Sequence, residues 1–129
     1  LCLISPSATM IKRSLIRDLK SFDESFIVCE DYDLWLRYTL KFSVAFVESP
    51  IIKKYGGHED QLSTKYKAMD YYRIKSMFQI LRNSELTNAQ QILIKKEIIL
   101  KGQILLNGYK KHQNMVDYEE VLNWMTLAS

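Results

Sequence analysis

The sequence predicts a mostly helical α+β fold, in which a partial α/β half with a few short strands precedes a C-terminal helical bundle. Only four glycines and two prolines occur in 129 residues, so tight turns should be few. Apolar residues recur at helical spacing throughout the second half, whereas short β-prone runs are confined to the first. The 47% hydrophobic and 26% charged fractions are typical of a globular chain. They exclude collagen-like, disordered and disulfide-scaffold classes.

The first half should alternate short β-prone runs with helices. Ser14 is a suitable N-cap for its first helix, and Asp23 and Ser25 can satisfy backbone groups in the turn that follows. The next helix has three acids in its first turn and bases toward its end, which suits the helix dipole. The expected elements are a strand-like run at 8–11, a helix at 14–20, a turn at 22–26, a helix at 30–41, β-prone runs at 43–48 and 51–55, and a polar loop at 56–63.

Every segment beyond the loop has a helical pattern. Thr87 and Gln90 have the spacing of a capping box, and Asn114 can cap the last helix with Asp117 three residues later. Gly108 is expected to bend or end the helix before it. The expected helices are one at 65–82, a long one after Thr87 that contains Ile92, Ile99, Leu100 and Leu106, and a last one that contains Tyr118, Val121, Leu122 and Met125.

The composition changes at Ser63, which divides the chain into residues 1–63 and 64–129. The first part carries eight Lys/Arg against nine Asp/Glu, and the second carries ten against six. The basic excess of the second part could attract nucleic acid or an anionic membrane surface. An ordinary solvated helical surface explains the same excess.

Cysteine usage and the start of the chain bear on location. Cys2 and Cys29 lack a CxxC spacing or a paired histidine, which indicates reduced structural thiols in a cytoplasmic protein. The sequence shows neither a secretory leader nor an apolar run long enough to cross a bilayer. The first methionine is Met10, so we expect that translation does not begin at Leu1; the chain is either the C-terminal piece of a longer protein or a separate short protein.

Adjacent carboxylates at a helix start form the candidate catalytic pair. Glu30 and Asp31 are close enough in sequence for their charges to influence each other, so one of them could act as a general base. Acids at helix N-termini also serve as simple stabilisers of the helix. Spacing alone leaves both interpretations open.

The surrounding motif favours catalysis. The window FDESFIVCEDYDLWLR, followed by a β-prone run, a proline and Tyr…His…Gln-Leu-Ser, resembles family 2 glycosyltransferases of the GT-A fold. The resemblance extends from about Ile4 to Ser63 and implies the acceptor-side half of the catalytic domain. Within it Asp31 would deprotonate the acceptor hydroxyl, and Glu30 would support or orient that base.

The resemblance also implies roles for other residues. Trp35 and Arg37 would pack and anchor the helix at the acceptor site, and Ser5 and Ser7, with Thr9, would face the acceptor pocket. His58 matches a histidine that helps to hold a divalent metal in some members of the family, so Mg²⁺ or Mn²⁺ is expected in a complete enzyme.

The donor half of such an enzyme has no counterpart in this sequence. Asp31-Tyr-Asp33 matches the Asp-x-Asp pattern but lies inside the predicted helix, and no separate Asp-x-Asp occurs. A nucleotide-binding half would need about 100 more residues with several parallel strands. We therefore expect transfer from a nucleotide-sugar to a glycan or lipid-linked acceptor in a complete enzyme, and no activity in this chain alone. The second part resembles the helical extension of some bacterial members, most clearly at 65–75.

The alternative is a non-catalytic helical module whose basic part binds a partner protein or an anionic surface. Homo-oligomerisation and peripheral contact at the inner face of the membrane are further expectations. A nucleic-acid partner is disfavoured, because the basic residues are dispersed and no zinc signature or RNP-like strand occurs.

Overall fold

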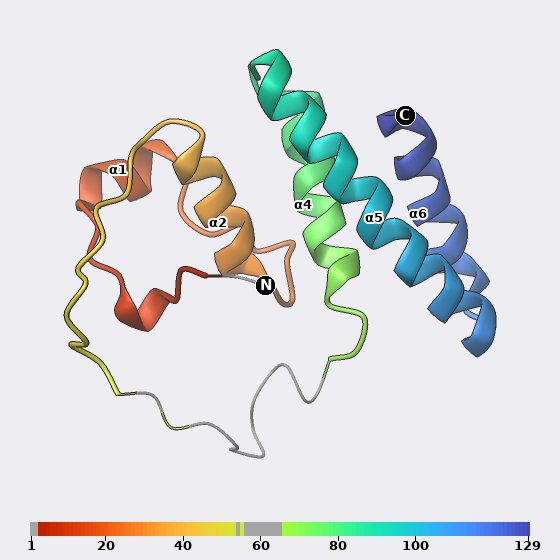
Figure 1. Ribbon diagram of the computed structural model, residues 1–129, viewed down its shortest axis with the longest axis horizontal. Helices are drawn as coiled ribbons and strands as arrows, with labels where there is room; N and C mark the ends of the chain where they lie inside the picture. Colours follow the sequence, from red (N-terminus) through yellow and green to blue (C-terminus); the bar gives the residue numbers. More distant parts are fainter. Residues whose placement is uncertain (1–2, 54, 56–65) are drawn as a thin grey trace. The chain divides into compact units, whose positions relative to one another are not determined.

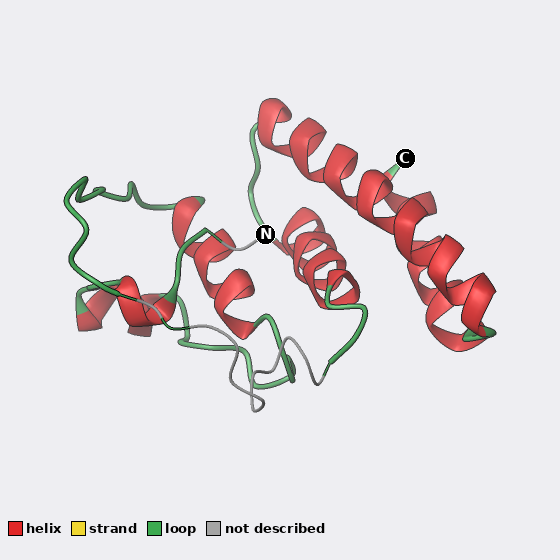
Figure 2. Cartoon of the chain, turned by 60° about the horizontal axis from the view of Figure 1, so that its bottom comes forward, coloured by secondary structure: helices red, strands yellow, loops and turns green. Residues whose placement is uncertain are grey.

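The computed structural model describes residues 3–53, 55 and 66–129, and the chain divides into two compact units, Leu1–Lys67 and Ala68–Ser129. The described residues contain helices and loops and no strand, as Figure 2 shows. The prediction of an α/β half is therefore wrong. The elements, labelled in Figure 1, are a 3-10 helix η1 (Pro6–Ala8) and the α-helices α1 (Arg13–Asp18), α2 (Glu30–Thr39), α4 (Asp70–Asn83), α5 (Asn88–His112) and α6 (Met115–Ala128).

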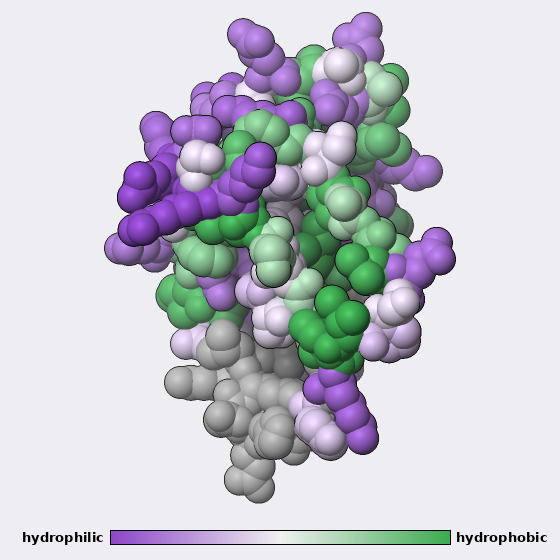
Figure 3. All heavy atoms as spheres, turned by 90° about the vertical axis from the view of Figure 1, so that its left-hand side faces the viewer, coloured by the Kyte–Doolittle hydropathy of each residue, from purple (hydrophilic) through white to green (hydrophobic). Residues whose placement is uncertain are grey.

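In the part of the chain that is described, the predicted strands are absent because these β-prone runs have no neighbouring strand to pair with. A strand is stabilised by hydrogen bonds and side-chain contacts to a neighbouring strand, and an isolated run lacks both. In the run after α2, Val44, Phe46 and Ile51 remain 53%, 86% and 73% exposed. Figure 3, in which hydrophobic residues are green, shows hydrophobic side chains open to solvent. The strand expected at 8–11 is replaced by η1, which begins at Pro6, and by irregular chain.

The first unit is organised around α2. Leu19, Leu34 and Trp35 form its buried cluster, against which Ile4, Ile11, Tyr38 and Phe42 pack. The helix α1 starts one residue before Ser14, so the predicted N-cap lies inside the helix and Lys12 occupies the cap position without a side-chain hydrogen bond. The predicted turn at 22–26 is confirmed by a hydrogen bond of 2.9 Å that Ser25 N donates to Asp23 Oδ1.

The second unit contains three helices, with α5 packed against both α4 and α6. Thr87 Oγ1 accepts a hydrogen bond from Gln90 N at 3.3 Å, and Gln90 Oε1 accepts one from Thr87 N at 2.9 Å. The predicted capping box is thus confirmed, as is the Asn114 cap, whose Oδ1 accepts from Asp117 N at 3.4 Å. Gly108 does not end α5, which continues to His112.

A glycine permits the close approach of α5 and α6. Gly102 is buried in α5, and a Cβ atom there would overlap Met125 Sδ and lie 2.7 Å from Met125 Cγ. Such distances are far inside ordinary van der Waals contact. The absence of a side chain at this position therefore lets α6 pack directly on the α5 backbone.

Tyr109 carries a buried polar group in α5. The residue is 6% exposed, and its hydroxyl has no hydrogen-bond partner among the described residues. Burial, and after it the negative charge of Asp117, raises the pKa of the Tyr109 phenol to about 12. Folding therefore favours the protonated phenol.

We expect Tyr109→Phe to stabilise the protein, most visibly at alkaline pH. Removing an unpaired buried hydroxyl should raise the free energy of unfolding by about 1 kcal/mol at neutral pH. The wild type should lose a further ~2 kcal/mol between pH 10 and 12, because the unfolded phenol ionises near 10 and the folded one near 12. The variant lacks that loss. Urea unfolding at pH 7 and across the alkaline range measures both effects. The control is Tyr55→Phe, an exposed tyrosine whose variant should follow the wild type. Coincident unfolding curves for the wild type and Tyr109→Phe would show that the buried hydroxyl does not destabilise the protein.

Candidate active site at the start of α2

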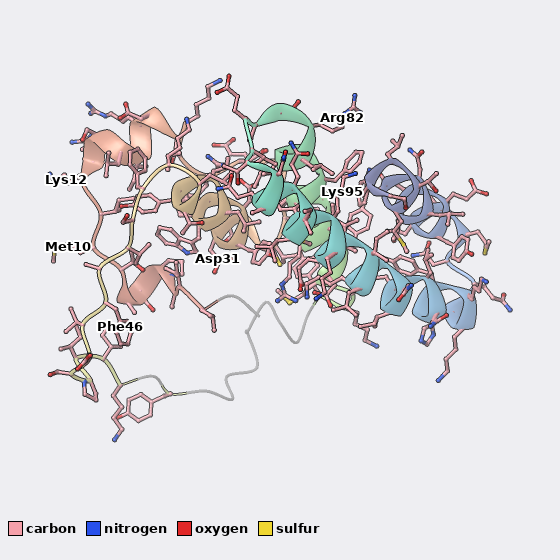
Figure 4. The ribbon with its side chains drawn as sticks, turned by 45° about the horizontal axis from the view of Figure 1, so that its top comes forward. Met10, Lys12, Asp31, Phe46, Arg82 and Lys95 are labelled. Atoms are coloured by element: carbon pink, nitrogen blue, oxygen red, sulfur yellow. The ribbon has the colours of Figure 1, made fainter. Side chains whose placement is uncertain are left out.

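The candidate catalytic pair lies in the first turn of α2. Cys29 precedes the helix in a left-handed conformation with φ of 62°, and Glu30, Asp31 and Asp33 follow it. Asp31 is partly exposed, and its Oδ1 accepts a hydrogen bond of 2.7 Å from Tyr32 N. Figure 4 shows Asp31 on α2. The positive end of the helix dipole stabilises carboxylates at this position.

A buried ion pair fixes the same helix. The Asp33 side chain is only 3% exposed, and its Oδ2 accepts a hydrogen bond of 2.8 Å from Arg37 Nε and lies 2.7 Å from Arg37 Nη2. The guanidinium also donates to two backbone carbonyls outside α2, to Leu19 O through Nη1 and to Ser21 O at 2.9 Å through Nη2. Arg37 therefore joins α2 to the turn that follows α1.

The backbone of that turn makes the contact possible. Lys20 and Ser21 both adopt a left-handed conformation with φ of 60°. For residues other than glycine this conformation is uncommon and needs support from its surroundings. Here the support comes from Arg37, which binds the carbonyls on either side of Lys20. Through these contacts Arg37 anchors α2 to the turn.

Trp35 has a packing role. It is 7% exposed, belongs to the buried cluster with Leu19 and Leu34, and makes an edge contact with Tyr38 at a ring separation of 6.3 Å. Its indole Nε1 is buried without a hydrogen-bond partner among the described residues. Trp35 and Arg37 together hold α2 in place by packing and by polar contacts, respectively.

The predicted acceptor-facing hydroxyls lie around η1. Ser5 Oγ and Ser7 Oγ are 3.0 Å apart, and Thr9 Oγ1 donates to Ser5 O at 2.7 Å. These bonds stay within the η1 segment, and no hydrogen bond connects its hydroxyls to Asp31 in the part of the chain that is described. His58, the predicted metal contact, lies outside the described residues.

The residues of α2 do not fit a divalent cation. A hard cation requires several free oxygen ligands, and an Asp-x-Asp pair would have to offer both its carboxylates. Asp33 directs its Oδ2 to Arg37 instead. Among the described residues no group of three or more His, Cys, Asp or Glu side chains comes together. A metal site is therefore not built on Asp31 and Asp33.

Asp33 is the residue of the candidate site whose role the sequence alone does not assign. Its position places it with the acids of the first turn, and in the structure it is the buried partner that orients Arg37. The signal was present in the sequence, since Asp33 and Arg37 are four residues apart and fall on one helical face.

Surface hollows occur elsewhere among the described residues. One, of about 490 Å³, is an open depression lined by residues 39–44 at the end of α2. Another, of about 420 Å³, lies among the helices of the second unit and includes Arg82 of α4 and Lys95 of α5, which Figure 4 labels. Both cations already have contacts, because Arg82 lies over the Phe78 ring and Lys95 Nζ donates to Ser129 O at 3.0 Å.

Comparison of the chain with family models, with curated proteins and with solved structures finds no match. Within the described residues, no helix combines the length and apolar character needed to cross a bilayer.

Proposed function

We propose that this chain supplies the acceptor-side carboxylate of a sugar-transferring enzyme, with Asp31 as general base. The observation that supports the proposal is that two acids of α2 differ in burial and in ion pairing. Asp33 is buried and committed to Arg37, whereas Asp31 is partly exposed and forms no ion pair among the described residues. A carboxylate that is accessible and rigidly held is what deprotonation of a bound hydroxyl requires.

The chemistry follows from that placement. The acceptor hydroxyl would lose its proton to an Asp31 oxygen while the hydroxyl oxygen attacks the anomeric carbon of a nucleotide-sugar, and the nucleoside diphosphate would leave from the opposite face. Glu30, the adjacent acid, would orient the acceptor or Asp31. Trp35 and Arg37 act indirectly, because they hold the helix that carries the base.

The acceptor would be a glycan or a lipid-linked sugar, with the hydroxyls of Ser5 and Ser7 among its contacts. Mg²⁺ or Mn²⁺ on the leaving diphosphate would be held by residues outside α2. We also propose a cytoplasmic location, at the inner face of the membrane.

Asp31→Asn tests the base assignment in the full-length protein. Turnover is measured as release of nucleoside diphosphate from a panel of nucleotide-sugars with glycan and lipid-linked acceptors. We expect kcat to fall about a hundredfold or more, because the amide cannot accept the proton. The matched control is Glu24→Gln, an exposed acid in the preceding turn, which should retain wild-type turnover. Unchanged kcat in Asp31→Asn, with helix content equal to that of the wild type, would refute the proposal.

A further inference from the structure

The helix α5 is apolar on two opposite faces. One face contains Ile98, Gly102, Leu105 and Tyr109, which are buried against the other helices of the second unit. On the other face Leu93, Leu100 and Ile104 are 63%, 51% and 63% exposed. Spacings of seven and four residues place these three side chains in one row along the helix. A helix that packs on one side normally exposes polar residues on the other.

Lysines accompany the exposed row. Lys96 and Lys111 are exposed, and the helical repeat puts both on the same side of α5 as the apolar row. We call Leu93, Lys96, Leu100, Ile104 and Lys111 the outer α5 stripe.

The net charge of α5 as a whole is positive, like that of the lysines in the stripe. The helix contains five lysines and a single acid, Glu97, whose Oε2 lies 3.9 Å from Lys101 Nζ. Lys101 also lies 3.6 Å from Asp70 Oδ1, so it faces α4 rather than the stripe. The outer face of α5 therefore combines an apolar row with exposed lysines, and Glu97, which the helical repeat also places there, is paired with Lys101.

We propose that the outer α5 stripe docks on the anionic phospholipid surface of a bilayer, with α5 lying in the plane of the interface. Interfacial helices combine a row of aliphatic side chains, which enter the acyl boundary, with lysines that reach anionic headgroups. The apolar row from Leu93 to Ile104 is about 16 Å long at 1.5 Å per residue, which suits a helix lying on the membrane. Docking there would keep the protein close to a lipid-linked acceptor.

Charge and composition favour a lipid surface over two other possible partners of the stripe, a second copy of the chain and a nucleic acid. A second copy of the chain would bring the same lysines against each other, and the single acid of α5, Glu97, already lies 3.9 Å from Lys101 Nζ. A nucleic acid would use the lysines but leave the aliphatic row in water. An anionic bilayer is complementary to both features.

The test is co-sedimentation of the full 129-residue chain with vesicles. We expect binding to phosphatidylcholine vesicles that contain phosphatidylserine, little binding to pure phosphatidylcholine, and weakening as salt is raised. The double variant Leu100→Ser with Ile104→Ser should lower the apparent affinity about tenfold or more, because the aliphatic contribution is lost. Lys96→Glu with Lys111→Glu should lower it by a similar factor, because two headgroup contacts become repulsive.

The matched control is Lys12→Glu with Lys41→Glu. It makes the same change in net charge at exposed lysines of the first unit, and it should bind as the wild type does. Circular dichroism verifies that each variant keeps its helix content. Equal binding to neutral vesicles, or wild-type binding by either stripe variant, would overturn the proposal. A wild-type dimer that the serine variant converts to a monomer would also overturn it and would identify a second copy as the occupant.

Discussion

Asp33→Ala should destabilise the first unit by about 3 kcal/mol in free energy of unfolding, because it leaves the Arg37 guanidinium without its buried counter-charge. The Coulomb attraction of the pair alone adds little to the free energy of unfolding, since both groups lose water on folding. Removing one partner is costly because the other remains partly buried and charged. Arg37 would keep its two carbonyl acceptors only if the helix stayed in place. The loss should therefore be concentrated in α2 and in the turn at 19–21.

Hydrogen exchange of the α2 amides measures this loss separately from the second unit. Protection of α2 should fall in Asp33→Ala, and Asp33→Asn should lose less because the amide oxygen can still accept a hydrogen bond from Arg37. Asp18→Ala removes an exposed acid at the end of α1 and should leave the protection of α2 unchanged. Wild-type protection in Asp33→Ala would show that the ion pair does not anchor the helix.

The second unit was the more predictable from sequence because its signals are local. A capping box, an asparagine cap and apolar residues at helical spacing depend on side chains a few positions apart. Thr87 and Asn114 accordingly mark the starts of α5 and α6. The prediction was less accurate at the start of α4, which begins at Asp70 rather than near residue 65.

The first unit was less predictable because its structure depends on contacts distant in sequence. The β-prone runs after α2 could become strands only beside a partner, and propensity does not supply one. The position of Glu30 and Asp31 at a helix start follows from the sequence alone. The anchoring of that helix does not, because Arg37 reaches carbonyls 16 and 18 residues away across a turn in left-handed conformation. The candidate base was thus visible in the sequence, and its support was not.

The contact between α4 and α6 depends on one large side chain. Trp124 of α6 is 8% exposed, and its ring stacks on Phe78 of α4 at 5.9 Å and lies tilted against Tyr71 at 5.2 Å. Tyr71 Oη in turn donates to Glu120 Oε2 at 2.5 Å. Burial, reinforced by this bond to the Glu120 carboxylate, raises the pKa of the Tyr71 phenol. The outer helices of the unit, which both pack on α5, therefore meet through an aromatic cluster.

Trp124→Ala should lower the free energy of unfolding of the second unit by about 4 kcal/mol, since it removes the aromatic contacts and leaves a cavity beside α4. A unit of this size has little more stability than that, so Trp124→Phe, which keeps a ring, provides a milder variant with a loss of about 2 kcal/mol. Urea unfolding followed by circular dichroism at helical wavelengths measures both, and the exposed Leu127→Ala should cost less than about 1 kcal/mol. If Trp124→Phe and Leu127→Ala were equally stable, the aromatic cluster would not be what joins α6 to α4, and the packing of both helices on α5 would suffice to hold the unit together.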